Sequence, residues 1–137
     1  MRKLYRSLIA AIALGGIACT DATGPKQVPL QFESFNPGAV LEIVKITSQP
    51  ASLRIVGSYS AAACGAAGAI ATLDGSTVRL TVGPRRENDV CDAALVGYAY
   101  DATVLGLESG MYNVEVFHRT NGGESAKLAA RDDVTVP

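Results

Sequence analysis

Residues 107–116 read LESGMYNVEV and contain the clearest strand pattern in the chain. The second half of this segment alternates apolar with polar residues, and its apolar positions are Tyr112, Val114 and Val116. Successive side chains of a strand point to opposite faces, so a period of two places these three on one face. Ser109-Gly110 ahead of them is a turn signal. The segment therefore predicts a turn followed by a half-buried β-strand.

The same period of two recurs along most of the chain. Val78, Leu80 and Val82 alternate with threonine and arginine, and weaker runs cover residues 29–34, 40–47, 52–60, 67–73, 93–104 and 126–136. Asp74-Gly75 predicts a tight hairpin, because glycine accepts the positive φ that such turns need. No stretch after residue 20 sustains a helical pattern, and we interpret the alanine-rich residues 59–69 as a tightly packed strand edge or loop. Seven or eight short strands predict an all-β domain, an antiparallel β-sandwich.

The pattern L-x-x-G-x-Y-x-V-x-V at residues 107–116 resembles a turn-and-strand signature of transthyretin-like and carboxypeptidase-regulatory-like β-sandwiches, and more loosely of immunoglobulin-like ones. The resemblance implies that Leu107 fills the core before the turn and that Gly110 makes the turn. It also implies that Tyr112 packs inward with its hydroxyl bonded back to the backbone, as in a tyrosine corner. Families with these folds are mostly binding, adhesive or spacing modules.

The N-terminus combines a basic head with a short apolar run. Arg2, Lys3 and Arg6 precede the uncharged residues 8–17, and no acidic residue occurs before Asp21. The run is much shorter than the roughly 20 residues that span a bilayer. The pattern predicts a helical secretory signal peptide, cleaved after residue 18.

Gly16-Ile17-Ala18-Cys19 resembles the lipobox of bacterial lipoproteins. The resemblance implies cleavage before Cys19, lipidation of that cysteine and a membrane anchor in the cell envelope, on the outer membrane or the periplasmic face. Small residues before the cleavage point also fit ordinary secretion. In that alternative, the product would be a soluble secreted or periplasmic protein with a free Cys19 thiol.

These boundaries predict a signal peptide at residues 1–18, a lipid-anchored tether at 19–27 and a β-sandwich domain at 28–137. The signal would remove three of the 12 basic side chains and none of the 13 acidic ones, so the mature net charge changes from −1 to −4. The remaining sequence has no basic stripe, and a polyanion would be repelled on average. We therefore expect no nucleic-acid partner.

With Cys19 lipidated, the mature chain keeps one pair of cysteines, Cys64 and Cys91. An even pair in an exported protein predicts a disulfide, which would close a loop worth roughly 3–4 kcal/mol. One alternative is a pair of buried reduced thiols. The other is half of a zinc site, which is disfavoured because His118 is the only histidine and no Cys-x-x-Cys motif is present.

Motifs of catalysis are absent from the sequence. His118 falls at the end of the inward-facing row of residues 112–116, which favours a partly buried structural histidine. No serine lies in a Gly-x-Ser-x-Gly elbow, and no Ser-x-x-Lys motif is present. We predict no catalytic residue, no cofactor and no metal site, and a small hydrolase is the least favoured function.

The densest charge cluster of the mature chain contains Arg85, Arg86, Glu87, Asp89 and Asp92. If Cys91 fixes this loop, the arginines could bind a carboxylate or phosphate, and the acidic residues could bind calcium. The spacing does not match the D-x-[DN]-x-[DN]-G calcium loop. The alternative is a solvated loop whose charges prevent edge-to-edge pairing of sheets.

The sequence as a whole predicts a non-catalytic lipoprotein of the cell envelope. Its β-sandwich would be a binding or interaction module for an envelope protein or a small molecule. The alternative function is protease inhibition, with the rigid loop at residues 85–92 inserted into the protease.

Overall fold

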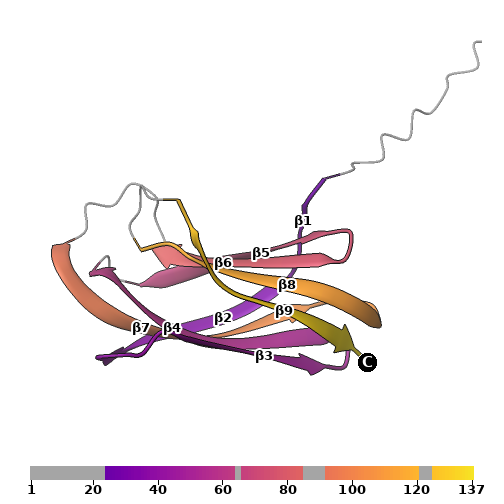
Figure 1. The fold of residues 1–137 in the computed structure, drawn as a ribbon, viewed down its shortest axis with the longest axis horizontal. Helices are drawn as coiled ribbons and strands as arrows, with labels where there is room; N and C mark the ends of the chain where they lie inside the picture. The colour runs from indigo at the N-terminus through magenta and orange to yellow at the C-terminus, as the bar shows by residue number, and fades with distance from the viewer. Residues whose placement is uncertain (1–23, 64–65, 85–91, 121–124) are drawn as a thin grey trace, which may run out of the picture.

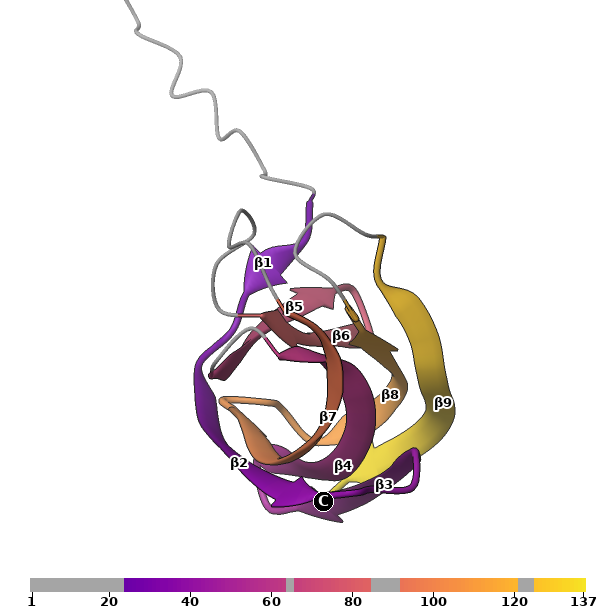
Figure 2. The ribbon, with the colours of Figure 1, turned by 90° about the vertical axis from the view of Figure 1, so that its left-hand side faces the viewer.

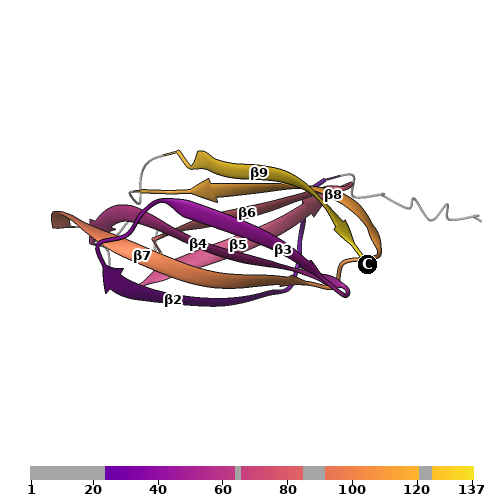
Figure 3. The same ribbon diagram turned by 60° about the horizontal axis from the view of Figure 1, so that its bottom comes forward.

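The computed structural model describes residues 24–63, 66–84, 92–120 and 125–137. Two β-sheets pack face to face across a single core (Figures 1 and 3). Within these ranges there is no helix, and the structure confirms the predicted all-β sandwich. The described part contains nine strands, where the sequence predicted seven or eight.

The strands divide unevenly between the two sheets. In chain order they are β1 (Lys26–Gln27), β2 (Leu30–Gly38), β3 (Ile43–Gln49), β4 (Ser52–Ala63), β5 (Ala67–Asp74), β6 (Thr77–Pro84), β7 (Asp92–Leu105), β8 (Gly110–His118) and β9 (Lys127–Val136). The five-stranded sheet has the order β1-β5-β6-β8-β9, and the four-stranded sheet has the order β2-β7-β4-β3. The last two residues of the segment predicted as a tether form β1.

Strand pairing is antiparallel with one exception among the described strands. β6 pairs with β8 in parallel, with Thr77 opposite Asn113 and Val82 opposite His118. Parallel neighbours need a crossover, and here the chain crosses to the other sheet as β7 before it returns as β8. In Figure 1, β7 is labelled in the lower layer and β8 in the upper layer.

The core consists of the inward-facing residues of both sheets. The five-stranded sheet contributes the predicted rows, and Val78, Leu80, Val82, Val114 and Val116 are all fully buried. The four-stranded sheet contributes Leu53, Ile55, Tyr59, Tyr100, Ala102 and Val104. The alternation in the sequence therefore gave the correct inward face for the central strands.

Asp74 and Thr77 close the predicted hairpin between β5 and β6, with Gly75 and Ser76 as its two turn residues. Gly75 has a φ of 57°, the left-handed conformation for which glycine was expected.

Two residues around the connection from β7 to β8, Leu107 and Tyr112, lie as the resemblance to transthyretin-like β-sandwiches implied. Leu107 is buried in the core, and the Tyr112 hydroxyl donates a 3.0 Å hydrogen bond to the carbonyl of Glu108. Gly110, the first residue of β8, has a φ of 157°, and Gly106 has the left-handed backbone, with a φ of 75°. The connection therefore uses Gly110 and also Gly106, which the sequence pattern did not single out.

Candidate functional site

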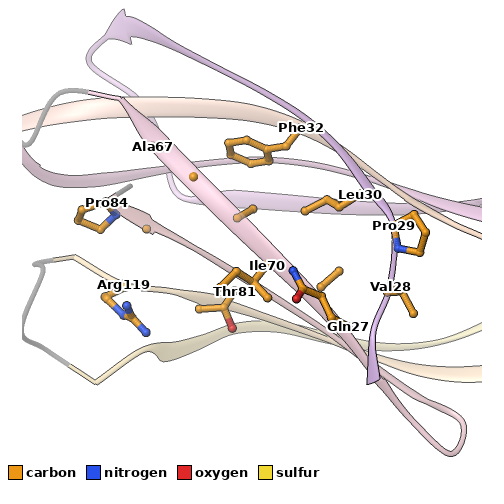
Figure 4. Close-up of a pocket in the computed structure, with 14 residues that line it drawn as sticks. Gln27, Val28, Pro29, Leu30, Phe32, Ala67, Ile70, Thr81, Pro84 and Arg119 are labelled. Carbon is orange, nitrogen blue, oxygen red and sulfur yellow. The ribbon is translucent and has the colours of Figure 1, made fainter. Parts of the chain in front are cut away.

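A groove of about 740 Å³ opens between β2 of one sheet and β5 of the other (Figure 4). Its walls expose polar and apolar surface in about equal parts, and they include Leu30, Phe32, Ala67, Ala69, Pro84 and Arg119. The groove lies on the side of the sandwich where the chain passes from the five-stranded to the four-stranded sheet, between β1 and β2 (Figure 2).

Pro29 marks the point where the N-terminal strand leaves β5. The amide of Val28 still donates to the carbonyl of Ala71 at 3.1 Å, but proline has no N–H to continue the ladder. The next residue, Leu30, already pairs with Val104 in the other sheet. In the described part of the chain, β5 therefore has no strand beside its outer edge from residue 67 to residue 70.

Within the described residues, no backbone group bonds to the outer edge of β5 at Ala67 or Ala69. Side chains and hydrogen-bonding groups alternate along an antiparallel strand, and the bond from Val28 shows that Ala71 directs its polar groups outward. Two and four residues earlier, Ala69 and Ala67 direct their N–H and C=O groups toward the same edge. Ala67 is buried and Ala69 is partly exposed. An unpaired row of backbone groups is a template for another strand.

Small residues on β5 keep the groove open. Its inward positions along the groove are Ala67, Ala69 and Ala71, and the fourth inward position, beyond the groove, is Leu73. The neighbouring β6 has a leucine and two valines at its inward positions. Methyl side chains cannot fill the space below Leu30 and Phe32. The alanine-rich segment thus contains a strand edge, as the sequence predicted. It also forms one wall of a groove, which the sequence did not predict.

Arg119 lies at one end of the groove (Figure 4). Its backbone amide donates to the carbonyl of Val82 at 2.8 Å, which extends the pairing of β8 with β6 by one residue. Gly83 makes room for it, because a Cβ on this glycine would lie 2.7 Å from the Cβ of Arg119.

His118 lies in the core and not on the surface. Its ring stacks on Tyr59, with centroids 4.4 Å apart, and its Nε2 atom lies 2.9 Å from the Tyr100 hydroxyl. Burial lowers the pKa of His118 to about 4, so the imidazole is neutral at pH 7. Burial also raises the pKa of Tyr100 above its ordinary value, so its hydroxyl keeps its proton. The tautomer of the imidazole decides which of the two groups donates in this hydrogen bond.

Several residues predicted from the sequence lie outside the described ranges: Cys19, Cys64, Arg85, Arg86, Glu87, Asp89 and Cys91. Asp92 begins β7, where its backbone lies opposite Ala63. Among the residues that the structure describes, no three His, Cys, Asp or Glu side chains are grouped closely enough to hold a metal ion. In the same ranges, no helix has the length and apolar character to cross a membrane.

Comparisons with known proteins find no matching family model, no matching curated protein and no matching solved structure.

Proposed function

We propose that this protein is a non-catalytic binding module of the cell envelope that takes an extended segment of a partner protein into the β2–β5 groove. The observation that carries the proposal is the open backbone edge of β5 beside a groove into which Leu30 and Phe32 project. A peptide that adds to such an edge gains main-chain hydrogen bonds, and its alternate side chains enter pockets. The burial of the one histidine in the core further favours binding over catalysis.

The groove defines the chemistry of the preferred segment. A guest strand beside β5 would bond through its backbone to Ala67 and Ala69. Every second guest side chain would then point between the sheets, toward Leu30 and Phe32, and these positions should be apolar. The intervening side chains would lie on the outer face near Ile70, which is half exposed, and they can be polar.

A synthetic peptide with the sequence of residues 77–82 tests this binding, because it alternates valine and leucine with polar residues. The chain has no tryptophan, so an Ile70→Trp variant provides a single fluorescent reporter at the groove. We expect saturable binding that Ala69→Leu weakens by at least about tenfold, because the larger side chain fills the space for the guest. The control Ala129→Leu, on exposed β9, should leave the affinity within about twofold.

Methylation of the peptide backbone separates strand addition from binding of side chains alone. Methyl groups on one alternate set of amides should abolish binding, and methyl groups on the other set should not, because only one set faces β5. Equal binding of both methylated peptides, or no binding of the parent peptide, would contradict strand addition.

We further propose that the module is held at a membrane by lipid on Cys19. The described chain pairs with β5 from Lys26 onward, only a few residues beyond that cysteine. A short tether of this length would keep the domain close to the bilayer surface.

The strand register supports the proposed disulfide. Ala63 lies opposite Asp92 in the antiparallel pair of β4 and β7. The register shifts between Ala62 and Ala63, and this pair is the last one that the structure describes. Cys64 follows Ala63 and Cys91 precedes Asp92 in the sequence, so the register of this pair, if continued by one residue, would place the two cysteines opposite each other. Directly opposed residues of antiparallel strands have Cα atoms about 4.5–5.5 Å apart, a separation that disulfides commonly span.

Intact mass of the protein purified from membranes tests both cysteine proposals together. We expect a chain that begins at Cys19, carries the added mass of the lipid and is two hydrogens lighter than the reduced form. Cys19→Ala should lose the lipid mass and leave the membrane fraction, while it retains the disulfide. An unlipidated wild-type protein would contradict the anchor, and two thiols open to alkylation in the native protein would contradict the disulfide.

A further inference from the structure

A flat row of two glycines joins Arg119 to the open edge of β5. The amide of Arg119 extends the pairing of β8 with β6 by one residue, which places Gly83 beside it. In the antiparallel pair of β5 and β6, Gly83 lies opposite Gly68. The row therefore runs from Arg119 through Gly83 to Gly68, and the arginine is its only member with a side chain.

The glycine row lies on the outer face of the five-stranded sheet. His118 is buried in the core, so Arg119 after it points outward, because successive residues alternate between the two faces of a sheet. Figure 4 shows Arg119 and Ile70 on the side of β5 away from Phe32. The arginine thus approaches the edge of β5 from outside the sandwich, and the apolar wall of the groove lies inside it.

The side chain of Arg119 crosses Gly83 toward β5. A Cβ on Gly83 would lie 2.7 Å from the Cβ and 3.6 Å from the Cδ of Arg119, so the aliphatic stem lies along this glycine. The Nε atom of the arginine is buried, and Arg119 lines the groove together with Gly68 and Gly83. The arginine therefore extends over β6 in the direction of the open edge.

A guest strand on β5 would be the third strand from β8. At about 4.8 Å per strand, its backbone would lie about 14 Å from β8, which is farther than an extended arginine reaches alone. The guest residue opposite Gly68 would face outward, because directly opposed residues of neighbouring strands share a face. A glutamate at this position can lie over Gly68, which has no side chain to obstruct it, and meet the guanidinium of Arg119 between the two strands.

We propose that the groove selects a partner segment with a glutamate opposite Gly68, and that Arg119 binds the carboxylate of this glutamate. The inference rests on the strand addition proposed above and adds a charge to the apolar pattern of the guest. Arg119 already interacts within its own chain, but a guanidinium has five N–H donors and can bind a carboxylate in addition. Two parallel hydrogen bonds between arginine and carboxylate give such a pair both strength and a defined geometry. The preferred segment therefore has a glutamate between two inward-facing apolar residues.

Three peptides based on residues 77–82 test this preference, because Arg79 occupies an outward position between apolar residues in that sequence. The peptides carry arginine, glutamine or glutamate at this position. Their ends are acetylated and amidated, so the glutamate supplies the only carboxylate. Isothermal titration calorimetry with the wild-type chain should show that the glutamate peptide binds about tenfold more tightly than the glutamine peptide. The arginine peptide should bind most weakly, because it opposes like charges.

Variants of Arg119 show whether this residue causes the preference. Arg119→Gln should bring the affinities of the glutamate and glutamine peptides to within about twofold of each other. Arg119→Glu should invert the order, so that the arginine peptide binds more tightly than the glutamate peptide. The control Arg131→Gln removes the same charge from β9 on the same face, and it should keep the preference for glutamate.

The outcomes separate this inference from strand addition itself. Equal affinity of the three peptides for the wild-type chain would overturn the role of Arg119 and leave strand addition standing. A preference for glutamate that persists in Arg119→Gln would do the same. Failure of all three peptides to bind would refute strand addition and this inference with it.

Discussion

Gly57→Ala is expected to destabilise the protein by about 3–5 kcal/mol. Gly57 lies in β4 directly opposite Tyr100 of β7, and the ring of Tyr100 lies over it. A Cβ on Gly57 would lie 2.8 Å from Cε1 of Tyr100 and closer still to its Cζ and Oη atoms. The ring cannot move away freely, because Tyr100 is fully buried and packs against Phe32 and Tyr59.

Displacement of Tyr100 would carry a second cost. Its hydroxyl is 2.9 Å from Nε2 of His118, so a shift of the ring separates two buried polar groups. Each group left without a partner costs about 1–3 kcal/mol in addition to the steric strain. Gly57 is thus the residue that allows the tyrosine to lie flat on its sheet and reach the histidine of the other sheet.

Chemical denaturation of the wild type and the variant measures this loss, with Gly24→Ala as the matched control. A Cβ on Gly24 meets no atom within 4 Å, so this control should keep wild-type stability. A double-mutant cycle with Tyr100→Ala identifies the cause, because Gly57→Ala should cost much less once the ring is gone. Equal costs in both backgrounds would show that the strain lies elsewhere.

The sequence predicted the parts of the fold that depend on local alternation. Tyr112, Val114 and Val116 face the core because their period of two requires one common face, and Asp74-Gly75 makes its hairpin because the turn is local. The parallel pairing of β6 with β8 could not be read from alternation. It depends on which sheet each strand joins, and that is decided by packing between distant segments.

The candidate groove could not be predicted from the sequence for a similar reason. Alternation of alanines at 67, 69 and 71 indicates a strand with small side chains, but it does not show which strand lies beside it. The open edge arises because Pro29 ends the pairing of β1 and Leu30 joins the other sheet. Proline after a short strand, facing an alanine row, is the signal that could have located the site.

Acidification is expected to reduce the stability of the protein by up to about 3 kcal/mol through His118 alone. This residue is only 6% exposed, and the groups packed on it are the neutral rings of Tyr59 and Tyr100. No carboxylate of the described residues pairs with the ring, so burial disfavours the charged imidazole and lowers its pKa from 6.5 to about 4.

The direction of the effect follows from proton binding. Between pH 6.5 and pH 4, the unfolded chain binds a proton at His118 and the folded chain does not, so unfolding is favoured as the pH falls. The stabilisation is fully present above pH 6.5 and is lost progressively down to about pH 4. Asp101 and Glu115 have pKa values lowered by their arginine partners, so their contributions are lost mainly at more acidic pH.

Unfolding free energies measured by denaturant at intervals between pH 7.5 and pH 4.5 should show this slope, and His118 is the only histidine that can contribute to it. His118→Gln keeps an acceptor for the Tyr100 hydroxyl and removes the titration, so its stability should be nearly constant over the same range. A wild-type protein with no slope above pH 4.5, or a His118→Gln variant with the wild-type slope, would show that the buried imidazole does not control the response. His118 contacts the Tyr59 and Tyr100 rings of the other sheet, so its protonation should loosen the packing between the two sheets. The near-ultraviolet circular dichroism of these tyrosines should therefore change along the same pH curve.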